Sequence, residues 1–75
     1  MIFPQSEIAG VCRTGPVQAA AMLELARGGD LYALAAVVVR GTYKHLVKLG
    51  ASPVAAMHHT HVLYSNIELN PKVGL

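Results

Sequence analysis

Cysteine, acidic residues and aromatic residues are all scarce in this sequence of 75 residues. Its one cysteine, Cys12, cannot form an internal disulfide, which excludes a small fold held together by disulfides. Charged residues make up only 13% of the chain, which excludes the charge-rich composition of disordered proteins. A chain this short forms one domain at most, over residues 1–75, and buries only a small core. We therefore expect an oligomer or a bound partner to complete its stability.

Long hydrophobic runs are also lacking. The longest apolar stretch, residues 31–39, ends at Arg40 and is roughly half the ~20 residues that a membrane-spanning helix needs. The first residues, Met1 to Pro4, lack the basic segment and the apolar run of a secretory signal. We therefore expect a cytoplasmic protein that has no membrane partner.

Apolar residues, by contrast, are abundant, and the net charge is small and positive. Hydrophobic residues make up 53% of the chain and the mean hydropathy is +0.44, so the sequence is expected to fold or to associate. Six Lys and Arg residues against four Asp and Glu give a formal net charge of +2. A charge this small does not by itself indicate a nucleic-acid partner.

Glycine and proline mark the ends of the first two expected helices. Ser6 is a suitable N-cap for a short helix over about 7–12, which the Thr-Gly-Pro cluster at 14–16 ends. Pro16 occupies the favoured first position of a second, alanine-rich helix that ends at the glycine pair 28–29. The first part of the chain is therefore expected to form two helices.

A third helix is expected after Asp30, a good N-cap, over residues 31 to about 40. Three consecutive valines, 37–39, suit a buried strand equally well, but the alanine-rich turns around them favour a helix. Gly41 lowers helix propensity by about 1 kcal/mol relative to alanine. We therefore expect a break or a kink at this glycine.

A helix-turn-helix is expected over about residues 42–66. Its first helix, 42–49, ends at Gly50, and the Ser-Pro pair 52–53 begins a capped second helix that runs to the end of the segment. The tail, 67–75, is either a short strand or an extended arm. The predicted fold is thus all-α, a small domain of four to five short helices.

Helical periodicity assigns two faces to the second helix of this segment. The face expected to meet the core is a small apolar stripe with two polar residues at its margins. The opposite face carries a mixed set of side chains that would read DNA base edges. The core stripe consists of Ala56, Leu63 and Ile67, with His59 and Thr60 at its margins, and the opposite face of Val54, Met57, His58, His61 and Ser65.

Three cations lie upstream of this helix. Lys44 and Lys48 are four residues apart and project together, and Arg40 lies one turn earlier. A basic stripe of this kind suits DNA phosphates. The two lysines also fit an ordinary solvated face, because cations are favoured near a helix C-terminus.

The stretches 37–41 (Val-Val-Val-Arg-Gly), 49–52 (Leu-Gly-Ala-Ser) and 61–64 (His-Val-Leu-Tyr) carry a resemblance to known proteins. Residues 33–64 resemble the helix-turn-helix region of small bacterial regulators, the plasmid TrfB-type repressors and the fimbrial PapB-type regulators. Two departures are a short interval between the glycines and a second helix without Arg, Lys, Gln or Asn before Asn66. The resemblance implies a homodimer whose second helix enters the major groove of double-stranded DNA, with these residues facing it: Ser52, Val54, Met57, His58 and His61.

Metal binding and catalysis have less support. The His58 and His61 side chains share one side of the expected helix, but His59 points away, and no Cys, Asp or Glu lies nearby in the sequence. The acidic residues are scattered and form no carboxylate pair. Cys12 lies beside Arg13, which favours a reactive thiolate, but a buried or unreactive thiol is the preferred interpretation. We therefore expect no metal, no cofactor and no catalytic residues.

Two functional hypotheses follow, of which the first is the leading one and the second is the alternative. The first is a small DNA-binding transcriptional regulator, acting as a homodimer whose contact surface comes from the alanine-rich helix and the tail. The second is a protein-binding module of phage or plasmid type, which docks an apolar helix face onto a host protein and inhibits or redirects it. The weak polarity of the second helix favours the second hypothesis. In the first, the residues that bind DNA are Arg40, Lys44, Lys48, Ser52, Val54, Met57, His58 and His61.

Overall fold

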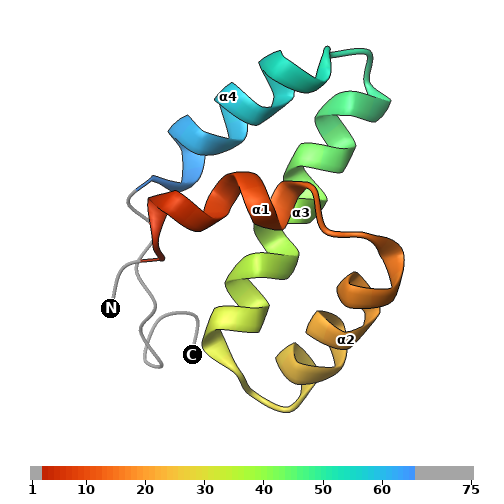
Figure 1. Ribbon diagram of the computed structural model, residues 1–75, viewed down its shortest axis with the longest axis vertical. Coiled ribbons are helices and arrows are strands. Elements are labelled where there is room, and N and C mark those ends of the chain that lie inside the picture. The colour runs from red at the N-terminus through yellow and green to blue at the C-terminus, as the bar shows by residue number, and fades with distance from the viewer. Residues whose placement is uncertain (1–2, 66–75) are drawn as a thin grey trace.

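A computed structural model describes residues 3–65, which form a short 3₁₀ turn and four α-helices (Figure 1). No strand occurs among these residues, so the predicted all-α fold is confirmed, including the helix through the three valines. The predictions for the tail, 67–75, lie outside the described residues. The elements are η1 (Gln5–Glu7), α1 (Ile8–Cys12), α2 (Pro16–Arg27), α3 (Leu31–Lys48) and α4 (Pro53–Tyr64).

Two local predictions are wrong. Gly41 does not break the third helix, because α3 continues through it as one helix to Lys48. The packing of α3 against three other helices outweighs the cost of one glycine. Ser6 is not an N-cap, because it lies inside η1, where the backbone N–H of Glu7 donates to the carbonyl of Pro4 at 3.1 Å. The backbone of η1 thus takes the place of a side-chain cap.

The capping residues of α3 and α4 are as predicted. The Asp30 carboxylate accepts a hydrogen bond from the backbone N–H of Ala33 at 2.8 Å, and the Ser52 hydroxyl accepts one from Ala55 at 3.1 Å. Each bond satisfies a backbone donor that the first helical turn leaves free. Gly50 has a φ of 108°, a left-handed conformation that suits glycine and lets the chain turn after α3.

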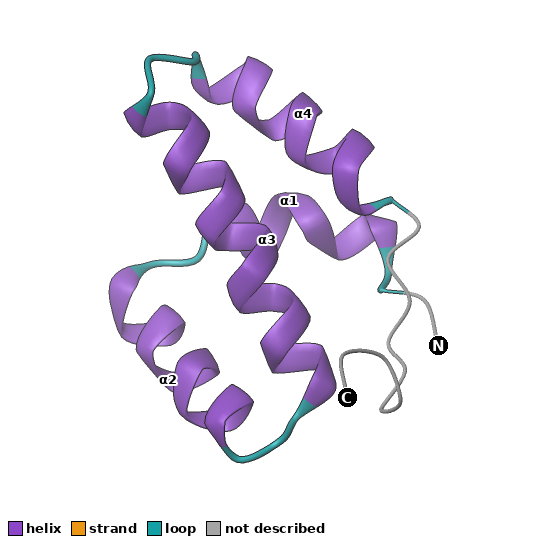
Figure 2. Cartoon of the chain, turned by 180° about the vertical axis from the view of Figure 1, so that it is seen from behind, coloured by secondary structure: helices purple, strands orange, loops and turns teal. Residues whose placement is uncertain are grey.

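The long helix α3 runs through the centre of the molecule, as Figures 1 and 2 show from opposite sides. The helix α2 lies beside its N-terminal half and α4 beside its C-terminal half. The short helix α1 packs against both α3 and α4. None of the helices in residues 3–65 combines the length and the hydropathy that crossing a bilayer requires.

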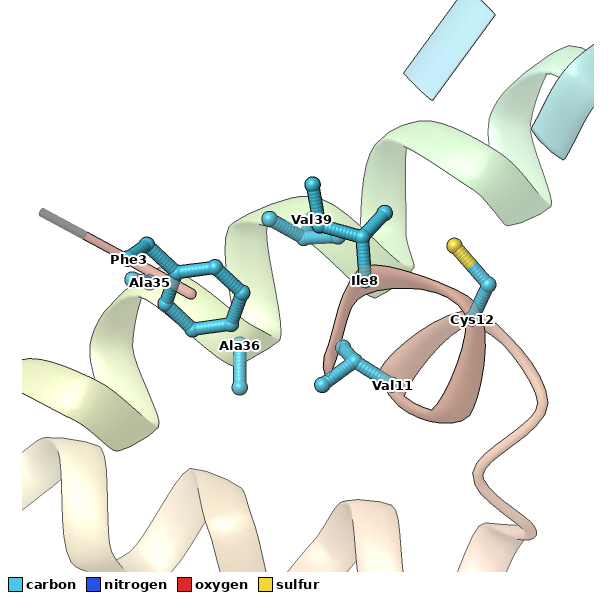
Figure 3. Close-up of a cluster of buried hydrophobic side chains, with 7 residues drawn as sticks. All are labelled: Phe3, Ile8, Val11, Cys12, Ala35, Ala36 and Val39. Atoms are coloured by element: carbon cyan, nitrogen blue, oxygen red, sulfur yellow. The ribbon is translucent and has the colours of Figure 1, made fainter. Parts of the chain in front are cut away.

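The core lies where α1 meets α3 (Figure 3). The ring of Phe3 adds to it and stacks on Tyr32, with the ring centroids 5.1 Å apart. Half-buried side chains of α4, among them Met57 and Tyr64, extend this core. The cluster is small and leaves α2 without a single buried residue. Its buried members are Phe3, Ile8, Val11, Cys12, Ala35, Ala36 and Val39.

Candidate functional site: the outward face of α4

The helix α4 lies at the outside of the molecule and turns one side toward α1 and α3 (Figure 1). On that side Ala56 and Thr60 are buried, and the Thr60 hydroxyl donates to the Ala56 carbonyl at 2.7 Å. The buried hydroxyl is therefore satisfied within its own helix. The other side is exposed and is called here the outward face of α4. It consists of Val54, Ala55, His58, His59, Val62 and Leu63.

The buried side of α4 differs from the predicted core stripe. Ala56 is buried as predicted, but Leu63 is 63% exposed, so its prediction as a core residue is wrong. Met57, predicted to face a ligand, packs against the core cluster instead. The reason is that α4 meets α1 as well as α3, so the helix buries the side that lies between the two. Ile67, the remaining member of the predicted stripe, lies outside the described residues.

Hydrogen bonds fix the C-terminal end of α4 against the rest of the molecule. The hydroxyl groups of Tyr64 and Thr42 lie 2.7 Å apart and join α4 to α3. The side-chain amide of Gln5 donates to the carbonyl of Ser65 at 3.4 Å, which joins the N-terminal turn to the end of α4. These contacts hold the rotation of α4 and thereby keep the same residues on the outward face.

The fold separates the predicted DNA-contacting residues of the second helix. Val54 and His58 lie together on the outward face, whereas Met57 and His61 are half-buried beside it. The hydroxyl oxygen of Ser52 accepts the capping hydrogen bond and is thereby engaged. Two of the five side chains therefore remain fully available to an external partner.

The predicted basic stripe is also divided. Lys44 and Lys48 are exposed on α3. Arg40 is half-buried, and its Nε donates to the carbonyl of Thr14 at 3.1 Å, which anchors the loop between α1 and α2. Arg40 thus has a structural contact that the sequence does not reveal. In the described residues the stripe reduces to the two lysines.

Charged residues are absent from the outward face. The sequence of α4 contains no Lys, Arg, Asp or Glu, and that of α3 contains no Asp or Glu. One cation lies near the start of α4, where Arg13 lines an open groove together with Tyr43, Pro53, Val54 and Met57. The outward face is therefore an apolar surface with two imidazoles, and Arg13 lines the groove at its N-terminal end.

Four residues of the outward face are not in the predicted site, namely Ala55, His59, Val62 and Leu63. The sequence does hold a signal that would have found them. Apolar residues occur on every side of this helix, which is unusual for a helix that faces water on one side. Such a pattern indicates a helix that is covered by another element or by a partner.

Among residues 3–65 the potentially reactive side chains are one buried thiol and histidines and carboxylates that do not gather in groups of three. Cys12 is only 1% exposed, and burial raises the pKa of its thiol, although the charge of Arg13 partly lowers it. Among residues 3–65, no group of three His, Cys, Asp or Glu side chains is arranged to hold a metal ion. The chemistry available to the outward face is therefore that of contact: apolar packing and hydrogen bonding by imidazole.

Comparisons of this chain with known protein families, curated proteins and solved structures find no match. The resemblance of residues 33–64 to the TrfB-type and PapB-type regulators stays a prediction.

Proposed function

We propose that this chain is a protein-interaction module that binds its partner through the outward face of α4. The observation that carries the proposal is the exposure of its apolar side chains, 80% for Val54, 61% for Val62 and 63% for Leu63. Neighbouring apolar side chains on the surface of a small protein typically mark a contact with another macromolecule. Covering such a side chain contributes up to about 2 kcal/mol to association.

The chemistry of the outward face fits a protein better than DNA. Most DNA affinity comes from Lys and Arg on phosphates, and base edges are read chiefly by Arg, Lys, Asn and Gln. None of these residue types occurs in α4. His58 and His59 supply polar groups at the centre of the face, which would orient a partner that packs on the apolar ends.

A pull-down with matched variants tests this proposal. The full chain, its Leu63→Asp variant and its Leu25→Asp variant are used as baits in a nuclease-treated lysate. Leu25 is a suitable control because it is 57% exposed, close to the value for Leu63, but lies on α2. We expect proteins captured by the wild type and by Leu25→Asp to be lost with Leu63→Asp. Equal capture by both variants would contradict the proposal.

DNA binding is a second candidate, favoured by the junction between α3 and α4. A glycine turn, a serine cap and an exposed flank of the second helix are the features of a helix-turn-helix, and Lys44 and Lys48 are exposed beside it. If both lysines contact phosphates, the logarithm of the affinity for duplex DNA should fall with the logarithm of salt with a slope of about −2 per protomer. Mobility shifts of wild type and of the Lys44→Gln, Lys48→Gln double variant measure this slope. No shift with wild type would exclude DNA as the partner.

A further inference from the structure

The outward face of α4 has the same chemical order in both directions along the helix. Its exposed residues come as three neighbouring pairs spaced by four: residues 54 and 55, 58 and 59, and 62 and 63. Both outer pairs are apolar and the central pair is His58 and His59. Rotating the helix by 180° about the midpoint between His58 and His59 therefore brings each apolar pair to the place of the other apolar pair, and each histidine to the place of the other histidine.

We propose that the partner covering this face is a second copy of this chain, packed with its α4 antiparallel across a two-fold axis between His58 and His59. This inference rests on the proposed function and names the partner of the same surface. A two-fold interface requires a surface that is complementary to itself. The reversal sets Ala55 opposite the partner's Val62 at the centre of the face, while Val54 and the partner's Leu63 lie at the same height on its two edges, so that both ends of the contact are apolar.

The charge of the face favours a second copy as well. A like-charged residue on a two-fold interface meets its own charge, which opposes self-association, and the outward face carries none. The helix α2 also exposes apolar residues, but its surface includes the Glu24–Arg27 ion pair and has no such reversed order. The outward face of α4 is therefore more complementary to a second copy of itself than the exposed surface of α2 is.

The two histidines provide the polar contact at the axis. A neutral imidazole has one donor and one acceptor nitrogen, so His58 can pair with the partner's His59, and the symmetry repeats the pair.

Light scattering over a range of concentrations tests the association. The face is a helix of 12 residues, about 18 Å long, which is smaller than a standard interface, so we expect a dimer that forms at roughly micromolar concentration. The mass should rise from 7.9 kDa at low concentration to twice that value at high concentration. Leu63→Asp should stay monomeric, whereas Leu25→Asp should dimerise like the wild type.

Disulfide trapping tests the register and the direction. In the antiparallel arrangement the two copies of residue 58 are offset by about 1.5 Å along the axis, and the two copies of residue 54 by roughly 13 Å. A disulfide requires Cα atoms within about 7 Å, so His58→Cys should form a linked dimer on mild oxidation and Val54→Cys should not. The wild type serves as a control, because Cys12 is buried and should not cross-link.

Three results would overturn the inference: a monomer at all concentrations, loss of the dimer in Leu25→Asp as well as in Leu63→Asp, or cross-linking of Val54→Cys. Circular dichroism of each variant establishes that it is folded. If the wild type is monomeric but Leu63→Asp still loses a protein that wild type captures from nuclease-treated lysate, the second copy is wrong and the proposed function stands. If Leu63→Asp changes neither the mass nor the capture, both are wrong.

Discussion

The hydroxyl group of Tyr64 in α4 donates a hydrogen bond to Oγ1 of Thr42 in α3, across 2.7 Å. The direction follows from the second contact of Thr42, whose hydroxyl donates its one hydrogen to the carbonyl of Val38 at 3.0 Å. Thr42 can then only accept from Tyr64. The bond joins residues 22 positions apart in the sequence and helps to set which side of α4 turns outward.

Replacing Tyr64 by Phe removes this donor and leaves the ring in place. We expect the free energy of unfolding to fall by about 1 kcal/mol, the usual contribution of one partly buried hydrogen bond. Urea denaturation followed by circular dichroism measures the change. In a Thr42→Val background the same substitution should cost clearly less, because the acceptor is already missing. An equal cost in both backgrounds would show that the two hydroxyl groups do not interact in solution.

Replacing Gly41 by Ala is expected to stabilise the chain. Gly41 lies within α3 and is exposed, and an added Cβ would meet no other atom within 4 Å. Alanine favours a helix over glycine by about 1 kcal/mol, so the unfolding free energy should rise by up to this amount. Gly50→Ala is the matched contrast, because its φ of 108° strains an L side chain and should cost about 1–2 kcal/mol. Thermal unfolding should therefore give a higher midpoint for Gly41→Ala than for the wild type, and a lower midpoint for Gly50→Ala.

Aspartate substitutions distinguish the two sides of α4. Leu63→Asp places a carboxylate on the exposed side, so we expect a folded protein with nearly unchanged unfolding free energy once the chain is dilute enough to be monomeric. Ala56→Asp places one at a position that is 1% exposed, where a charge without a partner costs several kcal/mol, and we expect it to unfold the chain. Circular dichroism of the two variants side by side checks the assignment of the faces. If Leu63→Asp unfolds the chain, the assignment of Leu63 to the exposed side of α4 is wrong.

The buried thiol of Cys12 should make stability depend on alkaline pH. Its pKa is raised from the ordinary 9.0 by burial, so the folded state holds the proton more tightly than the unfolded state does. The resulting stabilisation is fully present below pH 9 and is lost as the pH rises through the folded pKa. Unfolding free energies of wild type and Cys12→Val between pH 7 and about 10.5 isolate this effect from the titration of tyrosine and lysine. The wild type should lose more stability than the variant over this range.

Local signals in the sequence predicted most helix boundaries correctly. Asp30 and Ser52 begin their helices through bonds between neighbouring residues, and Gly50 takes a conformation that depends on its own missing Cβ. The failures at Ser6 and Gly41 have the opposite origin. In both cases contacts with the surrounding backbone or with other helices outweighed a local preference of about 1 kcal/mol.

The candidate site was predicted in part. Placing it on α4 followed from the capped start of that helix, and Val54 and His58 do lie on its exposed face. Which way Met57 and Leu63 point could not be predicted, because α4 carries apolar residues on all of its sides and no single apolar stripe marks the buried one. The contact of Arg40 with Thr14 joins residues 26 positions apart, and no local pattern in either segment predicts it.

The amino-acid order alone determined that this chain is helical, where most of its helices start and stop, and that its apolar content exceeds what a small core can bury. Those properties depend on backbone conformation and on composition, which act within a few residues of each position. The tertiary structure alone decided which apolar residues remain outside. The packing of α1 against both α3 and α4 selects one side of α4 for burial, and that choice leaves Leu63 and the two central histidines to the solvent or to a partner.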